Sequence, residues 1–237
     1  MQRIRFGVFT MSTKSFLSEF FATALLVFIG TGSVLFVQNE SIASPQLWIG
    51  IAFGCVVAFG ILIFGKLSGA HMNPAVTIAL WLDSSFEGNK VLSYLFAQFT
   101  GGIFGSYLLS RIYPQTQHYG DTLPVAGVWQ SFLLEFGLTF LLMAGVLRVV
   151  HRNRTVVFSA LLIGTIVGFE AYFAGPYCGA SMNPARSIAP AVFSGLWSDI
   201  WIYLSAPVLG AISALVFTRL QKPSDSQIIR LRRRENG

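Results

Sequence analysis

The sequence predicts an all-α membrane protein with six transmembrane helices and two shorter helices that enter the membrane without crossing it. Three observations predict this fold class. Of the 237 residues, 54% are hydrophobic and only 11% are charged, where a soluble domain would carry about 25% charged residues. Six apolar segments are long enough to cross a bilayer, and one short motif occurs twice.

A membrane-crossing helix needs about 20 predominantly apolar residues. Two apolar stretches, 73–82 and 183–193, are too short to span. Each begins at Asn-Pro, in which asparagine is a good N-cap and proline suits the first helical turn. Each is therefore predicted to be a half-helix that starts inside the membrane. The six predicted spans are residues 15–37, 47–65, 91–113, 128–150, 156–174 and 200–220.

The two half-helices belong to an internal repeat. Residues 69–75 read Gly-Ala-His-Met-Asn-Pro-Ala, and residues 179–185 read Gly-Ala-Ser-Met-Asn-Pro-Ala. Glu19-Phe20 in the first span likewise aligns with Glu135-Phe136 in the fourth. Each copy contains three predicted spans, an odd number, so the second copy must enter the membrane in the opposite orientation. Inverted repeats with broken helices near the bilayer midplane are a known transport architecture.

Basic residues predict the orientation, because cytoplasmic loops carry an excess of Lys and Arg. The protein is expected in a plasma or inner membrane, with both termini on the cytoplasmic side. Arg111 is then the basic residue on the outer side. Lys66 is expected in the loop before the first half-helix, and Arg186 in the second half-helix. The tail is predicted to anchor the protein at the membrane surface, with a lipid headgroup site as the alternative, and the net charge of +6 is not taken to indicate nucleic-acid binding. The predicted cytoplasmic basic residues are Arg3, Arg5, Lys14, Lys90, Arg148, Arg152, Arg154, Arg219, Lys222, Arg230 and 232–234.

The two repeated motifs resemble the signature loops of the major intrinsic proteins, the aquaporin family. The motifs run Ser-Gly-Ala-His-Met-Asn-Pro-Ala-Val-Thr from Ser68 and Gly-Ala-Ser-Met-Asn-Pro-Ala-Arg-Ser from Gly179. The resemblance covers about residues 15–220, the predicted channel domain, with repeats at about 15–113 and 128–220. A cytoplasmic N-terminus, 1–14, and a basic tail, 221–237, flank it. The resemblance implies a right-handed bundle and a homotetramer with one pore per subunit.

The resemblance also implies a function and the residues that perform it. The chain is expected to be a passive channel for water and for small uncharged solutes such as glycerol or ammonia, without catalytic activity, cofactor or metal, and closed to protons and ions. The tips of both half-helices would carry positive dipole ends at the pore centre and repel cations. The pore motif residues are Asn73, Pro74, Ala75, Asn183, Pro184 and Ala185, and the selectivity filter residues are Phe53, Ala171, Ala180 and Arg186.

Ala171 departs from the pattern of strict water channels, which typically have histidine at this position. With Ala180 also small, the filter is expected to be wider and less polar than in those channels. Ser187 and Ala191 nevertheless resemble water-type members, whereas residues 174–182 are similar to nodulin-26-like and tonoplast members. The solute range beyond water therefore stays open.

Three glutamates lie within predicted spans. Glu19 and Glu135 are expected to brace the half-helix loops by accepting backbone N–H bonds, with a proton relay as the alternative. Glu170 is expected to brace the second loop, with a pore-facing position as its alternative. His71 is expected to fix loop geometry rather than to bind a metal. Cys178 is predicted to be a packed residue, or otherwise an accessible thiol.

Two other classes of function compete with the channel. A secondary transporter can share inverted repeats and broken helices, but no further ionisable chain marks a route. An intramembrane enzyme would need a nucleophile–base pair or a metal set, which the sequence does not supply. Met11 is an alternative to Met1 as the start of translation.

Overall fold

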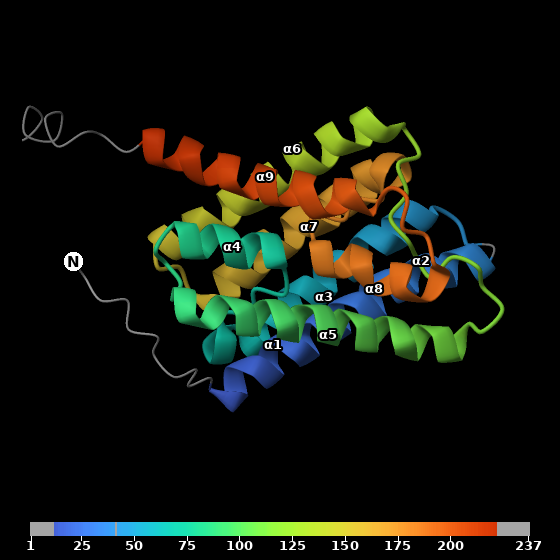
Figure 1. Ribbon diagram of the computed structural model, residues 1–237, viewed down its shortest axis with the longest axis horizontal. Coiled ribbons are helices and arrows are strands. Elements are labelled where there is room, and N and C mark those ends of the chain that lie inside the picture. The colour runs from blue at the N-terminus through green and yellow to red at the C-terminus, as the bar shows by residue number, and fades with distance from the viewer. Residues whose placement is uncertain (1–11, 41, 222–237) are drawn as a thin grey trace, which may run out of the picture.

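The computed structural model describes residues 12–40 and 42–221, so the predictions for Met1, Met11 and the basic tail lie outside the described residues. Every regular element within those ranges is a helix (Figure 1). The first span is formed by three continuous segments, because a π-helical stretch, η1, separates α1 from α2. The elements are α1 (Thr13–Leu25), η1 (Leu26–Thr31), α2 (Gly32–Asn39), α3 (Pro45–Ser68), α4 (Pro74–Leu82), α5 (Gly88–Ile112), α6 (Val128–His151), α7 (Val156–Cys178), α8 (Pro184–Ser194) and α9 (Ile200–Leu220).

These helices confirm the predicted fold class. Within the described residues, five helices are long and apolar enough to cross a membrane. The remaining predicted span, the third in chain order, corresponds to α5. This helix has 25 residues and is long enough, but polar residues such as Gln98 and Thr100 lower its hydropathy. Two details of the sequence prediction were wrong. Lys66 lies in the last turn of α3 rather than in the following loop, and α7 continues through Pro176 to Cys178 instead of ending at residue 174.

The helices pack in pairs that reproduce the internal repeat. In the first half α1 packs against α5, and in the second half α6 packs against α9. A glycine makes each crossing close, since a Cβ on Gly101 would collide with the carbonyl oxygen of Phe20, and one on Gly210 with that of Phe136. Phe20 and Phe136 are equivalent residues of the repeat, so the sequence symmetry is also a symmetry of packing.

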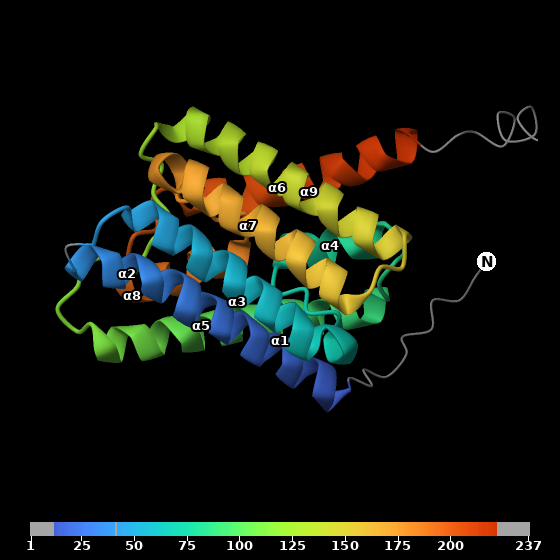
Figure 2. The same ribbon diagram turned by 180° about the vertical axis from the view of Figure 1, so that it is seen from behind.

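The two halves meet along α3 and α7, which lie side by side in Figure 2. A Cβ on Gly54 would lie 2.8 Å from the carbonyl oxygen of Gly164, and one on Gly164 would lie 2.7 Å from that of Gly54. Small residues at such crossings allow close backbone approach, as is typical between membrane helices. The half-helices α4 and α8 lie end to end between α5 and α9 (Figure 1), and their first residues contact each other's loops.

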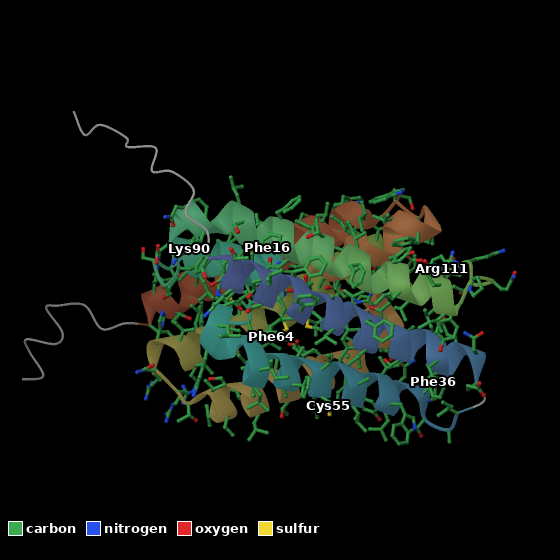
Figure 3. All side chains as sticks on the ribbon, turned by 90° about the horizontal axis from the view of Figure 1, so that it is seen from below. Phe16, Phe36, Cys55, Phe64, Lys90 and Arg111 are labelled. Carbon is green, nitrogen blue, oxygen red and sulfur yellow. The ribbon has the colours of Figure 1, made fainter. Side chains whose placement is uncertain are left out.

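The bundle has two distinct ends. The start of α1 and the end of α9 lie at one end, here called the terminal end. The end of α2 and the connections 113–127 and 195–199 lie at the other, here called the loop end (Figure 1). Lys90 and Arg111 mark opposite ends of α5 in Figure 3. Large apolar side chains such as Leu92, Phe96 and Leu133 are exposed along the outside of the helices, as expected for faces that contact lipid tails.

Candidate pore

Asn73 and Asn183 begin the two half-helices and contact each other's loops. The side-chain oxygen of Asn73 accepts a hydrogen bond from the N–H of Ala75 (2.9 Å), and that of Asn183 accepts one from Ala185 (3.0 Å). The amide nitrogen of Asn73 donates to the carbonyl of Met182, and that of Asn183 donates to the carbonyl of Met72, each over 2.7 Å. The two caps thereby join the two loops at the centre of the bundle.

The loop residues before each asparagine adopt an unusual backbone conformation. Ala70 and Met72 have φ angles of 50° and 52°, and Ala180 and Met182 have 41° and 53°. This left-handed region costs energy for residues other than glycine. Both repeats have this conformation at the same two positions, and local hydrogen bonds are needed to stabilise it.

Glu19 supplies hydrogen bonds to the first loop. One carboxylate oxygen accepts from the hydroxyl of Ser68 (2.7 Å) and from the N–H of His71 (2.9 Å). The other oxygen accepts from the N–H of Met72 (2.9 Å) and from the side-chain amide of Gln98 (2.8 Å). The carboxylate is fully buried, and these four donors compensate for its loss of water.

Glu135 has the equivalent position at the second loop. Its two carboxylate oxygens accept from the N–H groups of Ser181 and Met182, each over 2.7 Å. The counterpart of Gln98 in the second repeat is Pro207, which offers no donor. Two backbone N–H groups at each loop are thus bound by the glutamate that the repeat places beneath it.

A cavity of about 380 Å³ runs past both asparagines. On α3 its wall is formed by Phe53, Val57, Ile61 and Gly65, spaced by one helical turn. On α7 it is formed by Val156, Ser159, Ile163 and Val167, which follow the same spacing. Apart from Ser159, these two walls are therefore apolar, and most of the polar groups come from the two loops. Those loop residues are 68–73 and 180–183, together with Arg186 at the end towards the loop end of the bundle.

Three of the four predicted filter residues come together at one end of this cavity. Phe53, Ala180 and Arg186 all line it and are buried. The guanidinium carbon of Arg186 lies 5.4 Å from the centre of the Phe53 ring. Its Nη1 donates to the carbonyl of Gly120 over 2.7 Å, and its Nε has no hydrogen-bond partner among residues 12–40 and 42–221.

Ala171 is buried but does not line the cavity. It lies one helical turn beyond Val167, which is the last residue of α7 that lines the cavity. A side chain larger than alanine at this position would extend the wall formed by Val167. The structure therefore places Ala171 next to the cavity end, without direct exposure to the enclosed space.

Three further sequence predictions can be compared with the geometry. His71 lines the cavity, and its Nδ1 is 3.1 Å from the hydroxyl of Thr77. Cys178 is fully buried, which agrees with the packed alternative. The bracing role for Glu170 was wrong, because neither carboxylate oxygen has a hydrogen-bond partner within the described part of the chain. The physical reason is that Glu135 already binds the loop N–H groups.

Several residues at the site were not identified from the sequence. Gln98 donates to Glu19 and also to the hydroxyl of Thr77 (2.9 Å), and a buried glutamine in the third span was the available signal. Gly120 provides the carbonyl for Arg186, and no sequence signal identifies it, since the contribution comes from the backbone. No cluster of three or more His, Cys, Asp or Glu side chains suited to a metal occurs in the described ranges.

Comparisons with known proteins agree with this geometry. The profile of the family described as Major intrinsic protein matches residues 8–217. The aquaporin NIP2-2 of Zea mays is 37% identical over 210 residues, which cover 88% of this chain and 71% of the relative. The aquaporin NIP6-1 of Arabidopsis thaliana is 35% identical over 218 residues, covering 91% and 72% of the two chains. The X-ray structure of the aquaglyceroporin from Plasmodium falciparum superposes with a TM-score of 0.76 at 27% identity, covering 86% of this chain and 94% of that one. The chain belongs to the major intrinsic protein family.

Proposed function

We propose that the cavity between Arg186 and Phe86 is the pore of a passive channel for water and for small uncharged solutes such as glycerol. The observation that carries this proposal is the convergence of two half-helix tips on one cavity. Each asparagine amide has two N–H groups, of which one binds the opposite loop. The second N–H of each is available to a permeating oxygen atom, and loop carbonyls can accept hydrogen bonds in return.

The same arrangement supports exclusion of protons and cations. The N-terminus of each half-helix carries about half a positive charge from its aligned peptide dipoles. Arg186 adds a permanent charge at the narrow end, where its side chain is 3% exposed. A cation would have to leave water and pass all three positive groups, whereas a neutral molecule meets hydrogen-bond donors.

The proposed solute range includes molecules larger than water. Ala180 and Ala171 leave two sides of the filter without long side chains, so Phe53 and Arg186 define the opening. The walls that α3 and α7 form nearer the terminal end are apolar apart from Ser159, which suits the carbon skeleton of a polyol. Similarity to a solved aquaglyceroporin supports this range.

The charge distribution supports a cytoplasmic terminal end. Among the described residues, Lys14, Lys90 and Arg219 lie towards it, and Arg111 lies at the loop end. Both termini would then be cytoplasmic, in a plasma or inner membrane. A homotetramer, with one pore per subunit, is proposed from family membership.

Stopped-flow light scattering on proteoliposomes tests the proposal. Water flux with a low activation energy, and glycerol flux that stays linear in the gradient, are the expected results. A saturable glycerol flux would favour a secondary transporter instead. Water flux equal to that of empty vesicles, at verified insertion, would overturn the channel assignment.

A further inference from the structure

The guanidinium of Arg186 is held by the connection between α5 and α6. The acceptor of its Nη1 is the carbonyl oxygen of Gly120, at 2.7 Å. Gly120 has a φ angle of +76°, and a Cβ on it would collide with the side chain of Thr31. The backbone conformation that aims this carbonyl at Arg186 is therefore one that a residue with a side chain would not readily adopt.

The next residue, Asp121, is a carboxylate buried beneath the same loop. Its side chain is 4% exposed. One oxygen accepts a hydrogen bond from the hydroxyl of Ser194 on α8 (2.8 Å). The other oxygen has no hydrogen-bond partner within residues 12–40 and 42–221. Burying a carboxylate with an unbonded oxygen costs free energy. A nearby positive charge could offset that cost.

Three ionisable groups lie around Asp121, and Arg186 carries the positive charge. Arg186 on α8 attracts Asp121, and the positive charge of Arg186 is stabilised by Glu135 on α6 and, to a smaller extent, by Asp121. The imidazole Nδ1 of His118, on the same loop, lies 3.9 Å from the free oxygen, but His118 is half exposed. Asp199, before α9, lines the same small cavity of about 30 Å³ without acting on Arg186.

Hydrogen bonds fix this loop to the second half-helix as well. The hydroxyl of Thr122 donates to that of Ser187 (2.9 Å), which lies 2.5 Å from the hydroxyl of Ser181. Ser181 in turn donates to the carbonyl of Asn183 (2.9 Å). The loop, Arg186 and the half-helix tip therefore form one connected unit. Its charged groups are Arg186, Asp121 from the loop, and Glu135, which binds the tip from α6.

We infer that Asp121 is a positioning residue for the selectivity filter: its negative charge holds Arg186 against Gly120, and loss of that charge lets the guanidinium move into the opening beside Phe53. This inference rests on the proposed function of the cavity as a pore. Permeability to glycerol falls more than permeability to water when Asp121 is neutral, because the larger solute needs the full opening. Acid at the loop end has the same effect as removal of the carboxylate.

The direction of the pH dependence follows from burial. Burial raises the pKa of Asp121 above its ordinary value of 3.8, against the opposing effects of Ser194, Arg186 and His118. The carboxylate is charged above its pKa, so the filter is open there. As the pH falls through that raised pKa, Asp121 takes up a proton and the filter narrows.

The test measures the ratio of glycerol to water permeability in proteoliposomes with equal pH on both sides, from about pH 7.5 to about pH 5. Equal pH makes the result independent of the orientation of insertion. For the wild type, the ratio is expected to fall by about twofold to fivefold, the range of one partly exposed charge contact. Asp121→Asn should show the low ratio at every pH, and Asp121→Glu should retain the dependence.

Two matched variants separate Asp121 from its neighbours. Asp199→Asn removes the other carboxylate of the small cavity, and His118→Gln removes the imidazole that lies 3.9 Å from Asp121. Asp199→Asn should keep the wild-type profile. His118→Gln should keep the fall but move it to higher pH, because His118 opposes the rise in the pKa of Asp121. If either abolishes the pH dependence, or if Asp121→Asn retains it, the inference is overturned. If Asp121→Asn does not insert, the wild-type and Asp121→Glu profiles decide, since a flat wild-type ratio also refutes it. Absence of any wild-type flux would refute the proposed function instead.

Discussion

Gly30 lies directly against the ring of Phe53. A Cβ built on Gly30 would approach ring carbon Cε1 to 2.5 Å, closer than real Cβ atoms come to another heavy atom. Gly30 is part of the π-helical stretch η1, and π-helical insertions often occur at functional sites. Because residue 30 has no side chain, the first span leaves space for the Phe53 ring.

Replacing Gly30 with Ala is expected to displace the Phe53 ring. The added methyl group should cost about 1–3 kcal/mol of stability through overpacking, measured as a lower unfolding temperature in detergent. Because Phe53 lines the cavity beside Arg186, glycerol permeability should fall more than water permeability.

Gly137→Ala is the matched control for this substitution. A Cβ on Gly137, in α6, meets no heavy atom within 4 Å among the described residues. It should therefore leave both permeabilities and the unfolding temperature near those of the wild type. Equal behaviour of the two variants would show that Gly30 does not set the position of the ring.

Sequence reasoning identified the parts of this site that repeat. The half-helices, the two asparagines and both bracing glutamates are doubled in the chain, so each copy supports the interpretation of the other. Gly30 and Gly120 could not be found in this way. Gly30 acts by leaving space for the Phe53 ring, and Gly120 acts through its backbone carbonyl. Glu170 was misjudged because the sequence does not show that the N–H groups of Ser181 and Met182 both bind Glu135, while Glu170 has no partner in the described ranges.

Glu19→Gln and Glu135→Gln are expected to reduce stability more than selectivity. Each substitution places an amide N–H opposite a donor, such as the N–H of Met72 or that of Met182. Each hydrogen bond to a charged group is worth about 1.5–3 kcal/mol. Lower unfolding temperature and lower yield should follow, with an unchanged glycerol-to-water ratio in protein that inserts correctly.

Glu170→Gln provides the comparison for these two variants. Its carboxyl group has no hydrogen-bond partner in the described ranges, so the substitution breaks no hydrogen bond. Its unfolding temperature should stay level or rise. If Glu19→Gln and Glu135→Gln instead insert normally but abolish flux, the proton-relay alternative gains support.

Ala171→His is expected to lower glycerol permeability more than water permeability. Histidine would extend from α7 towards the opening between Phe53 and Arg186, beyond the present end of the cavity at Val167. Ala171→Ser is the control, since it adds one hydroxyl with little volume. A glycerol-to-water ratio that is the same in the His and Ser variants would remove Ala171 from the filter.

Arg186 is expected to limit the width of the filter and to provide its positive charge. Its guanidinium is permanently charged, and its planar fork offers five donors, of which the one at Nη1 is bound to Gly120. Arg186→Val should widen the filter and increase proton or sodium leak, while water still passes. Arg186→Lys keeps the charge and loses the fork, so it should preserve ion exclusion better than Val but relax solute selectivity. The comparison needs leak currents normalised to correctly inserted protein, together with glycerol and water fluxes of the same preparations. Negligible leak in both variants, with unaltered selectivity, would show that the half-helix dipoles alone exclude ions and that Arg186 serves to hold the loop at Gly120.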